Sequence, residues 1–316
     1  MKTVLVNRPI HPEAIKRLKQ EVNVLTPYSA SEEELMALLP DVHGILLSMG
    51  IRMTSEVIDR CTRLEVIGRH GAGYDIVDVE AAVKKGIVVT YTPYGPTEST
   101  AEHAFLLMMA AARHLSVTDR ALRNGDFQIR ERVVGWELKD KSVGIVGFGR
   151  IGKRFAEMCR GAFDMTVYVY DPVIEASEVE AWGAVYVSDI LEFARQVDFI
   201  SVHCPLIPQT RHLINADVLS AMKSNGILVN AARGPIVDEK ALYEALQKKK
   251  ISAAGLDVFE QEPPQPDNPL FGLDNIVLTP HLAGFTEEGR KRMGLTAAED
   301  ILRVLRGEPP KYPVKP

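Results

Sequence analysis

Arg233, Glu262 and His281, all in the second half of the chain, are the side chains best suited to chemistry. A guanidinium stays charged and can hold a carboxylate through two parallel hydrogen bonds. Histidine titrates near neutrality, so His281 can exchange a proton with a substrate oxygen. A carboxylate such as Glu262 would stabilise the protonated ring and fix its orientation. These types suit hydride transfer to a 2-keto acid, although each alone is equally typical of a surface charge or a structural histidine.

A glycine-rich stretch supplies the matching cofactor site. Residues 143–146 have strand character and run into Gly147, Gly149 and Gly152, after which a helical pattern begins. The first glycine permits a tight turn, the second lets the backbone approach a pyrophosphate, and the third lets helix and strand pack closely. The spacing alone is weak evidence, but the flanking strand and helix favour dinucleotide binding over an ordinary turn. The predicted contacts here are Gly147, Gly149, Arg150, Ile151 and Gly152.

Asp171 ends the next predicted strand, residues 166–170, where an acid that binds the adenosine ribose belongs. Its carboxylate can accept hydrogen bonds from the 2′- and 3′-hydroxyls. It repels a 2′-phosphate by roughly 4 kcal/mol per pair of unit charges at ~4 Å. Residues 172–175 contain no Arg or Lys to reverse that preference. The sequence therefore predicts NAD rather than NADP.

The composition is that of an ordinary globular protein, with 316 residues, 46% of them hydrophobic and 25% charged. This length is comfortable for two domains, and the net charge of −5 argues against a nucleic-acid partner. Cys61, Cys159 and Cys204 lie far apart without ligand-like spacing, so we expect no disulfide, no metal and a cytoplasmic location. The apolar run 104–112 is too short to cross a membrane, and the N-terminus has no signal-peptide pattern.

Residues 2–91 alternate short β-rich runs with helical patterns. Such alternation predicts a parallel, doubly wound sheet that binds ligands beyond the carboxyl ends of its strands. Ser31 followed by Glu34 forms a capping box at the start of one helix. The predicted strands are residues 3–6, 22–25, 44–47, 64–67 and 87–90, and the predicted helices are residues 11–20, 31–39, 54–60 and 77–85.

Three loops follow strands at the ligand-binding edge of this first sheet: residues 48–50, 69–73 and 91–97. The second reads RHGAG, and its glycines expose backbone amides beside an arginine and a histidine. That combination suits an anionic ligand, and a plain glycine-rich turn is equally consistent with it. The candidate residues for such a ligand in these loops are Ser48, His70, Gly71, Ala72 and Gly73, and the resemblance described below implies that the ligand is the substrate.

The pattern of strands and helices resumes after residue 141. One long helix over residues 99–123 precedes it, too apolar for a surface helix and therefore expected between two domains. A C-terminal helix over residues 287–306 cannot form a domain alone, so it should pack on the first one. The predicted strands are residues 142–146, 166–170, 184–187, 199–203, 227–230, 253–257 and 276–278.

The predicted fold class is α/β, with two doubly wound parallel-sheet domains and a cleft between them. Residues 1–98 and 286–316 form a flavodoxin-like substrate-binding domain, and residues 99–285 form a Rossmann NAD-binding domain. Four strand ends of the second domain carry polar or small residues: 203–206, 230–234, 257–264 and 279–284.

The chain resembles the D-isomer specific 2-hydroxyacid dehydrogenases, most closely in pattern the catalytic part of the D-3-phosphoglycerate dehydrogenases. The resemblance covers nearly the whole chain. It is carried by residues 69–75, 99–104, 144–153, 170–172, 203–206, 230–234 and 257–259, by Glu262 with Pro263, and by Pro280 with His281.

The resemblance implies roles for the strand-end residues. Arg233 would bind the substrate carboxylate, Glu262 before Pro263 would support the histidine in preference to Glu260, and His281 would be the acid/base. Asp257 would reach the nicotinamide carboxamide, and members of the family are usually homodimers or larger, which implies a homodimer or homotetramer. The further implied cofactor contacts are Thr100, His203, Cys204, Pro205, Ala231, Ala232, Asp257 and Gly284.

Two departures bear on the substrate. Phosphoglycerate dehydrogenases generally have a basic residue after the third strand, where this chain has Ser48, and an Asn where it has Pro96. Arg52 or His70 could substitute as the phosphate ligand, and the chain leaves no room for a regulatory domain. We therefore expect a smaller or uncharged 2-keto acid such as hydroxypyruvate, glyoxylate or a branched aliphatic acid. A D-3-phosphoglycerate dehydrogenase and a non-catalytic NAD-binding sensor or corepressor remain the alternatives.

Overall fold

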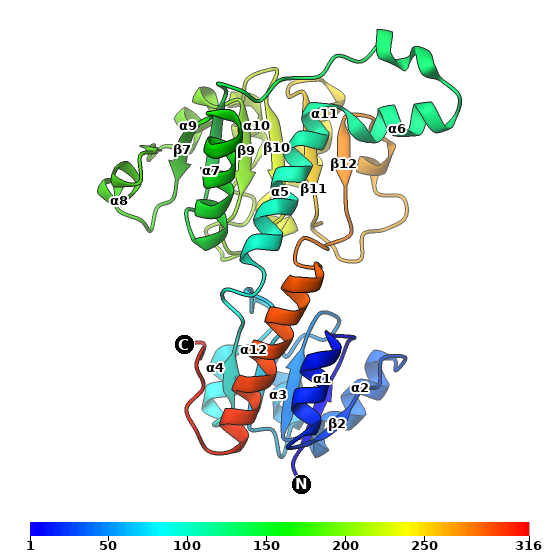
Figure 1. The fold of residues 1–316 in the computed structure, drawn as a ribbon, viewed down its shortest axis with the longest axis vertical. Helices are drawn as coiled ribbons and strands as arrows, with labels where there is room; N and C mark the ends of the chain where they lie inside the picture. The colour runs from blue at the N-terminus through cyan, green and yellow to red at the C-terminus, as the bar shows by residue number, and fades with distance from the viewer. Residues whose placement is uncertain (316) are drawn as a thin grey trace. The chain divides into compact units, whose positions relative to one another are not determined.

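The computed structural model describes residues 1–315, and these fold into two compact units (Figure 1). The first unit contains residues 1–99 together with the segment from Gly284 onward, and the second unit is Thr100–Ala283. Pro316, the last residue of the predicted substrate-binding domain, lies outside the described residues. No helix formed by residues 1–315 has both the length and the apolar character to cross a membrane.

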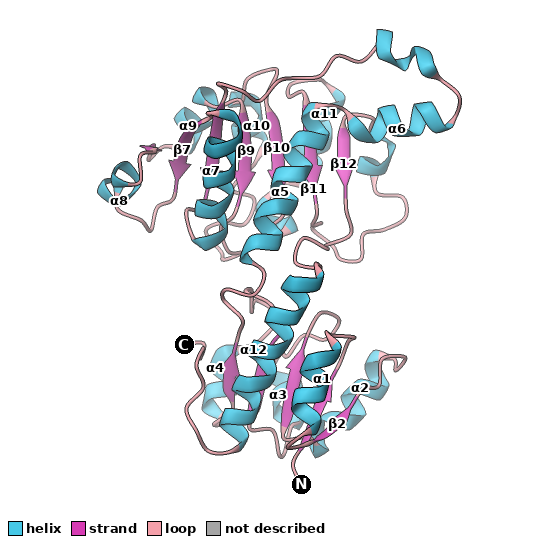
Figure 2. Ribbon diagram, in the orientation of Figure 1, coloured by secondary structure: helices cyan, strands magenta, loops and turns pink. Residues whose placement is uncertain are grey.

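The first unit is a five-stranded parallel sheet in the order β2-β1-β3-β4-β5 with helices on its faces (Figure 2). This order is the flavodoxin-like one, as the sequence predicts. The strands are β1 Thr3–Val6, β2 Asn23–Leu25, β3 Gly44–Leu47, β4 Val66–Arg69 and β5 Val88–Thr90. The helices are α1 Pro12–Lys19, α2 Glu32–Leu38, α3 Ser55–Arg60, α4 Val79–Lys84 and α12 Glu287–Leu305, with the 3₁₀ turn η1 Leu39–Asp41.

Both faces of this sheet are buried. Val4 and Val66 face the cluster that includes residues of α12, whereas Leu5 and Ile67 face the cluster on the opposite side. Alternate residues of one strand thus enter two cores, which is why the strands read as nearly continuous apolar runs. The C-terminal helix α12 packs against α1 and against strands β3 and β4.

The second unit is a seven-stranded parallel sheet in the order β12-β11-β10-β9-β6-β7-β8. The order reverses at β6, as in a Rossmann fold, so the predicted fold class is confirmed. Its strands are β6 Ser142–Val146, β7 Thr166–Tyr170, β8 Val185–Tyr186, β9 Phe199–Val202, β10 Ile227–Asn230, β11 Ala253–Leu256 and β12 Ile276–Leu278. The helices are α5 Thr97–Ala112, α6 Leu115–Arg123, α7 Arg150–Phe163, α8 Ala176–Ala181, α9 Ile190–Gln196, α10 Ala216–Ala221 and α11 Glu239–Gln247, with 3₁₀ turns η2 Phe127–Glu131, η3 Gly234–Ile236 and η4 Pro269–Gly272.

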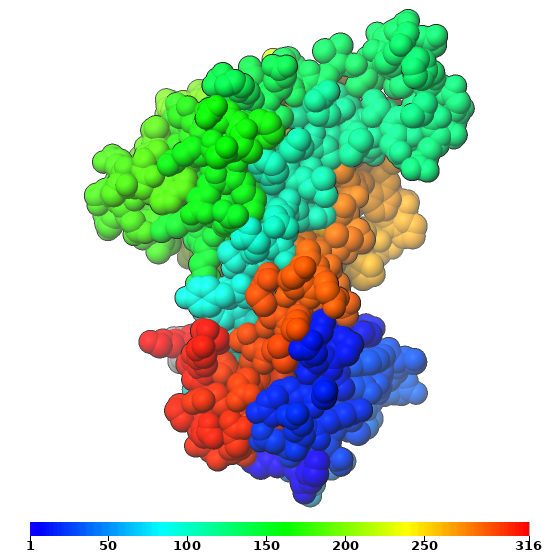
Figure 3. Space-filling model, viewed as in Figure 1, coloured from blue at the N-terminus to red at the C-terminus, as the bar shows by residue number. Residues whose placement is uncertain are grey.

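The predicted single helix over residues 99–123 is wrong, because the chain forms α5 and α6 with a break at His114. His114 adopts a left-handed conformation with φ 51°, which an α-helix cannot continue through. The amide of Trp136 then donates to the last carbonyl of α5, that of Ala112, at 2.9 Å. Helix α6 has no buried residue and lies at the surface in the teal region of Figure 3.

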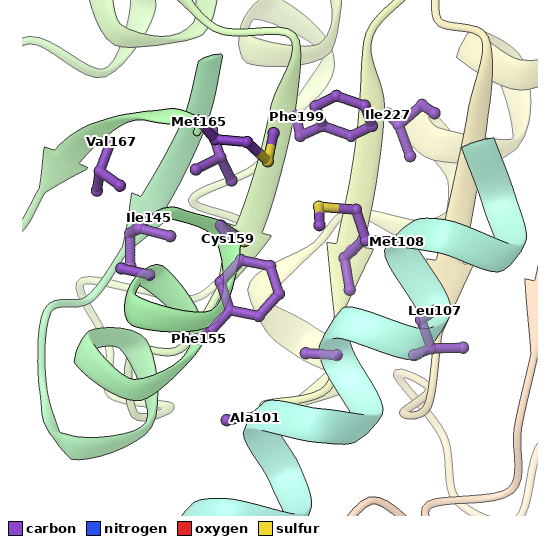
Figure 4. Close-up of a cluster of buried hydrophobic side chains, with 14 of the residues drawn as sticks. Ala101, Leu107, Met108, Ile145, Phe155, Cys159, Met165, Val167, Phe199 and Ile227 are labelled. Carbon is purple, nitrogen blue, oxygen red and sulfur yellow. The ribbon is translucent and has the colours of Figure 1, made fainter. Parts of the chain in front are cut away.

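Helix α5 belongs to the core of the second unit. Leu107 and Met108 project from α5 toward residues of the central strands, and Phe155 and Cys159 project from α7 into the same cluster (Figure 4). Its apolar character, which the sequence shows clearly, is therefore explained by burial against its own sheet.

Candidate active site

The glycine-rich loop joins β6 to α7 at the point where the strand order reverses. A Cβ on Gly152 would overlap the carbonyl oxygen of Gly147, and one on Gly147 would press on the backbone of Cys204. A Cβ on Gly149, the N-cap of α7, would meet no atom within 4 Å. Packing thus requires glycine at positions 147 and 152. Gly149 leaves open space at the N-terminus of α7, which suits a pyrophosphate.

Asp171 lies beside this loop, directly after β7. Its Oδ2 accepts a hydrogen bond from the amide of Phe148 at 2.8 Å, and its Oδ1 accepts one from Val173 at 3.0 Å. These bonds fix the carboxylate, and each oxygen retains a lone pair that could accept from a ribose hydroxyl.

His281 and Glu262 form a close pair in the second unit. The Nδ1 of His281 lies 2.7 Å from the Oε2 of Glu262, and the side chains are 29% and 23% exposed. The Oε1 of Glu262 accepts from the amide of Phe259 at 3.1 Å, so both carboxylate oxygens are held. The Nε2 of His281 has no hydrogen-bond partner within residues 1–315 and can therefore serve a substrate.

Arg233 lies in the loop after β10, next to the strand that leads to Glu262. Its Nη1 donates to the carbonyl of Ala232 at 2.7 Å, and the Asn230 side chain bonds to the Arg233 carbonyl at 2.9 Å. A Cβ on Gly234 would overlap the backbone of Phe259, so these two loops are in direct contact. Strands β10, β11 and β12 are neighbours, which brings the loops of Arg233, Glu262 and His281 to one edge of the sheet.

Asp257 follows β11 and is completely buried. Its Oδ1 accepts from the Thr279 hydroxyl at 2.6 Å and from the Leu282 amide at 2.9 Å, and its Oδ2 accepts from the Ala283 amide at 2.8 Å. His103 on α5 lies 3.4 Å from the same carboxylate. Burial favours a raised pKa for Asp257, but hydrogen bonds from His103, Thr279 and the two amides outweigh it, and the pKa is lowered.

His203 and Cys204 follow β9, and neither presents a charged group. The Nε2 of His203 lies 2.9 Å from the Ser201 hydroxyl, the ring centroid lies 5.0 Å from that of Phe155, and burial lowers the pKa of His203 to about 3. Burial raises the pKa of the Cys204 thiol to about 12. With Pro205, these residues can contribute shape and backbone atoms to a cofactor site.

The loops of the first unit offer two amides to an anion. The Gly71 amide is already engaged, donating to the Thr92 hydroxyl at 2.9 Å and to the Arg69 carbonyl at 3.1 Å. The amides of Ala72 and Gly73 have no hydrogen-bond partner within residues 1–315. These two amides can donate to an anion at this edge of the sheet.

His70 is buried with an Nε2 atom that has no hydrogen-bond partner in the described chain. Burial, with the charge of Arg69 second, lowers the pKa of His70 to about 4, so its ring is neutral at pH 7. His70 therefore cannot replace the positively charged residue that is missing at Ser48, after the third strand. Ser48 is buried, and its amide donates to the Asn7 side chain at 2.7 Å.

Arg8, His103 and Thr279 are not among the site residues that the sequence predicts. The Arg8 guanidinium packs against Gly50 in the Ser48 loop, where a Cβ on that glycine would lie 2.7 Å from the Arg8 Nη2. Arg8 has no ion pair or hydrogen bond with residues 1–315. Its place directly after the first strand, at the same edge as Ser48, is the signal that could have found it.

The remaining predicted cofactor residues lie in α5, in the Arg233 loop and at the start of the C-terminal segment. Thr100 is buried at the start of α5, and Gly284 opens the C-terminal segment of the first unit. Ala231 and Ala232 lie in the Arg233 loop. Their contacts with NAD remain predictions. The part of the chain that the structure describes contains no cluster of three or more His, Cys, Asp or Glu side chains able to hold a metal ion.

A Rossmann sheet with its glycine loop and an acid-backed histidine at the strand ends defines the class of the nucleotide-dependent α/β proteins. Within that class, residues 105–283 match the family model described as "D-isomer specific 2-hydroxyacid dehydrogenase, NAD binding domain". The chain belongs to the D-isomer specific 2-hydroxyacid dehydrogenase family.

Three known proteins illustrate the similarity. A D-3-phosphoglycerate dehydrogenase of Methanocaldococcus jannaschii is 44% identical over 98% of this chain, which spans only 58% of that relative. A glyoxylate reductase of Pyrococcus furiosus is 38% identical over 97% of this chain and 93% of its own length. The structure of D-lactate dehydrogenase from Aquifex aeolicus complexed with NAD and lactic acid matches with a TM-score of 0.85 and 30% identity, over 97% of this chain and 96% of that one.

Proposed function

We propose that this chain is an NAD-dependent oxidoreductase that interconverts a D-2-hydroxy acid and its 2-keto acid. The single observation that carries the proposal is the 2.7 Å contact between His281 Nδ1 and Glu262 Oε2, in loops adjacent to that of Arg233. This is the arrangement that an acid/base histidine needs beside a carboxylate-binding cation. Family membership and the relatives named above support the same reaction class.

Each residue has a defined task in this proposal. NAD, when bound on the glycine loop, supplies or accepts the hydride at C2 of the substrate. Arg233 holds the substrate carboxylate by paired hydrogen bonds. In the reduction direction the Nε2 of His281 gives its proton to the carbonyl oxygen, and in oxidation it removes the proton of the hydroxyl. Glu262 keeps the ring oriented through its contact with Nδ1.

We assign substrate-carboxylate binding in the first unit to the amides of Ala72 and Gly73. We assign the preference for NAD over NADP to Asp171, whose carboxylate lies beside the glycine loop. A 2′-phosphate there would meet a like charge, which costs roughly 4 kcal/mol per pair of unit charges at ~4 Å.

The substrate that best fits the lack of a basic residue at Ser48 is a small 2-keto acid, such as glyoxylate, hydroxypyruvate or a branched aliphatic acid. The direct test is NADH oxidation by the purified chain over a panel of these acids, repeated with NADPH. The proposal expects turnover of at least one acid, preference for NADH, and loss of most turnover in His281→Ala with NADH affinity retained. Binding of NADH without turnover of any acid would instead favour a non-catalytic sensor.

A second candidate function, D-3-phosphoglycerate dehydrogenase, is favoured by the position of Arg8. Its guanidinium lies against the Ser48 loop, has no partner within residues 1–315, and could bind a phosphate. If this function is right, 3-phosphohydroxypyruvate will be the best substrate, and Arg8→Gln will raise its KM by about tenfold while sparing hydroxypyruvate. Arg60→Gln, which removes an exposed arginine at the end of α3 in the same unit, is the matched control. If wild type and Arg8→Gln both use the two acids equally well, this candidate function is excluded.

We also propose that the protein is a homodimer or homotetramer. Leu115 and Leu122 on α6 are 53% and 58% exposed, and Phe127 and Val134 in the segment that follows are 59% and 82% exposed. Four large apolar side chains so exposed over one stretch are typical of a surface that a second copy covers. Sedimentation equilibrium should give a mass of at least twice 35.0 kDa, and a single-chain mass would refute the proposal.

A further inference from the structure

We propose that Asp257, Thr279 and His103 are positioning residues for His281, holding its loop in the conformation that presents the ring. The inference rests on the proposed function in that His281 is taken as the acid/base. The ring of His281 has no hydrogen bond with any of the three residues. They act on the backbone on both sides of it, whereas Glu262 acts on the ring itself.

Asp257 binds three consecutive amides of the His281 loop. The amide of His281 donates to the Asp257 carbonyl at 2.7 Å, and the amides of Leu282 and Ala283 donate to its carboxylate at 2.9 and 2.8 Å. The carboxylate is completely buried, so water does not compete for these bonds. We call these three bonds, together with the bond from Thr279, the loop anchor.

The loop needs such an anchor because His281 adopts a left-handed backbone conformation, with φ 52°. This conformation is uncommon for a residue with a Cβ atom and persists only where neighbouring interactions determine it. The strained residue is also the one with the free imidazole Nε2 atom. A backbone conformation fixed at His281 keeps the imidazole in one orientation, as an acid/base group requires.

Thr279 and His103 support the Asp257 carboxylate through a chain of hydrogen bonds. The Thr279 hydroxyl donates to the Asp257 Oδ1 at 2.6 Å, which leaves its oxygen to accept from the His103 Nε2 at 2.9 Å. His103 is only 10% exposed and lies 3.4 Å from the same Oδ1. A buried carboxylate is costly unless donors surround it, and α5 supplies the last of them.

The anchor therefore predicts a particular kind of defect. Removing the Thr279 hydroxyl should let the loop relax from the left-handed conformation and carry the ring of His281 away from Glu262. The glycine loop lies between β6 and α7, away from the His281 loop, and keeps its own contacts, so nucleotide affinity should persist. Misplacement of a catalytic group by about 1 Å can lower the rate roughly 100-fold.

The test compares Thr279→Val, which keeps the shape without the hydroxyl, with Thr279→Ser, which keeps the hydroxyl. We expect Thr279→Val to lower kcat by at least about tenfold. Its KM and the Kd for NADH should stay within about threefold of wild type, because Thr279 is not a predicted cofactor or substrate contact and the substitution leaves the glycine loop and Arg233 unchanged. Thr279→Ser should recover most of kcat. Amide hydrogen exchange in residues 281–283, followed by mass spectrometry without substrate, should be faster in Thr279→Val and near wild type in Thr279→Ser.

A kcat for Thr279→Val within twofold of wild type, or unchanged exchange in residues 281–283, would overturn the proposal. An equal loss of NADH affinity would also overturn it, by showing a cofactor-binding or purely structural role. If Thr279→Val does not fold, His103→Leu and His103→Gln make the same comparison, because Gln retains a donor. If wild type turns over no 2-keto acid, the proposed function fails, and hydrogen exchange alone decides on the anchor.

Discussion

Glu262 is restrained at both carboxylate oxygens, by the His281 ring at 2.7 Å and by the Phe259 amide at 3.1 Å. The carboxylate in that position holds the Nδ1 edge of the ring and leaves Nε2 for a substrate. Glu262→Gln preserves the shape but removes the charge. We therefore expect kcat to fall about 10²-fold, with NADH affinity unchanged, in steady-state and binding measurements.

Glu260 provides the matched control for that substitution. It lies two residues away, and its carboxylate contacts His212 at 2.8 Å and the Glu239 amide at 3.1 Å rather than His281. Glu260→Gln should leave kcat within about twofold, because it changes no group that faces His281. Equal losses of kcat in the two variants would mean that the negative charge of the loop as a whole matters, rather than the specific contact between Glu262 and His281.

At the level of elements, the contact between the β10 and β11 loops decides whether Arg233 and Glu262 lie together. Gly234 has no room for a Cβ, because that atom would overlap the carbonyl of Phe259. Gly234→Ala must push the two loops apart. Overpacking of this kind typically lowers the free energy of unfolding by roughly 1–3 kcal/mol. We expect a lower Tm together with a loss of most of kcat, measured by thermal unfolding and turnover.

Gly161→Ala controls for the loss of a glycine. A Cβ there would meet no atom within 4 Å, and the residue lies inside helix α7. Alanine should stabilise that helix by about 0.5–1 kcal/mol and leave turnover intact. If Gly234→Ala behaved like Gly161→Ala, the close approach of the two loops would not matter for the site.

Local chemistry explains which elements could be predicted. The Ser31 capping box forms as expected, with the Glu34 amide 3.2 Å from the Ser31 hydroxyl, and most strands begin and end within two residues of their predicted bounds. These features depend on side chains close in sequence. The break at His114 could not be predicted, because its cause is the distant segment that returns to Ala112.

The same division applies to the candidate site. Arg233, Glu262 and His281 could be proposed from the sequence, because their types, their positions after strands and the family resemblance are all visible there. The loop anchor was not, because Asp257, Thr279 and His103 come from three elements and only the fold brings them within hydrogen-bond distance. Likewise the Gly71 amide looked available until the structure showed it bound to Thr92.

At the scale of the whole molecule, the net charge of −5 is opposite to what attraction of an anionic substrate requires. Anion binding must therefore come from local groups at the sheet edges. The groups proposed for this role are the Arg233 guanidinium and the amides of Ala72 and Gly73. High salt should weaken substrate binding only modestly, since such contacts act at short range.

Stability of the whole chain should fall in mild acid because of buried neutral histidines. Burial first, and the charge of Arg69 second, lower the pKa of His70 from 6.5 to about 4. Between pH 6.5 and about pH 4 the unfolded chain binds a proton at His70 that the folded chain does not bind, so the free energy of unfolding decreases as pH falls. The slope is roughly 1.4 kcal/mol per pH unit for one such group, and burial of His203 acts in the same direction.

Thermal unfolding at pH 7.5 and pH 5, followed for wild type and His70→Gln, measures this contribution. Glutamine cannot titrate, so the variant should lose less Tm on acidification than wild type does. Identical acid sensitivity in wild type and His70→Gln would mean that the folded protein accommodates a charged His70, and the loop after β4 would then have to open enough to hydrate it.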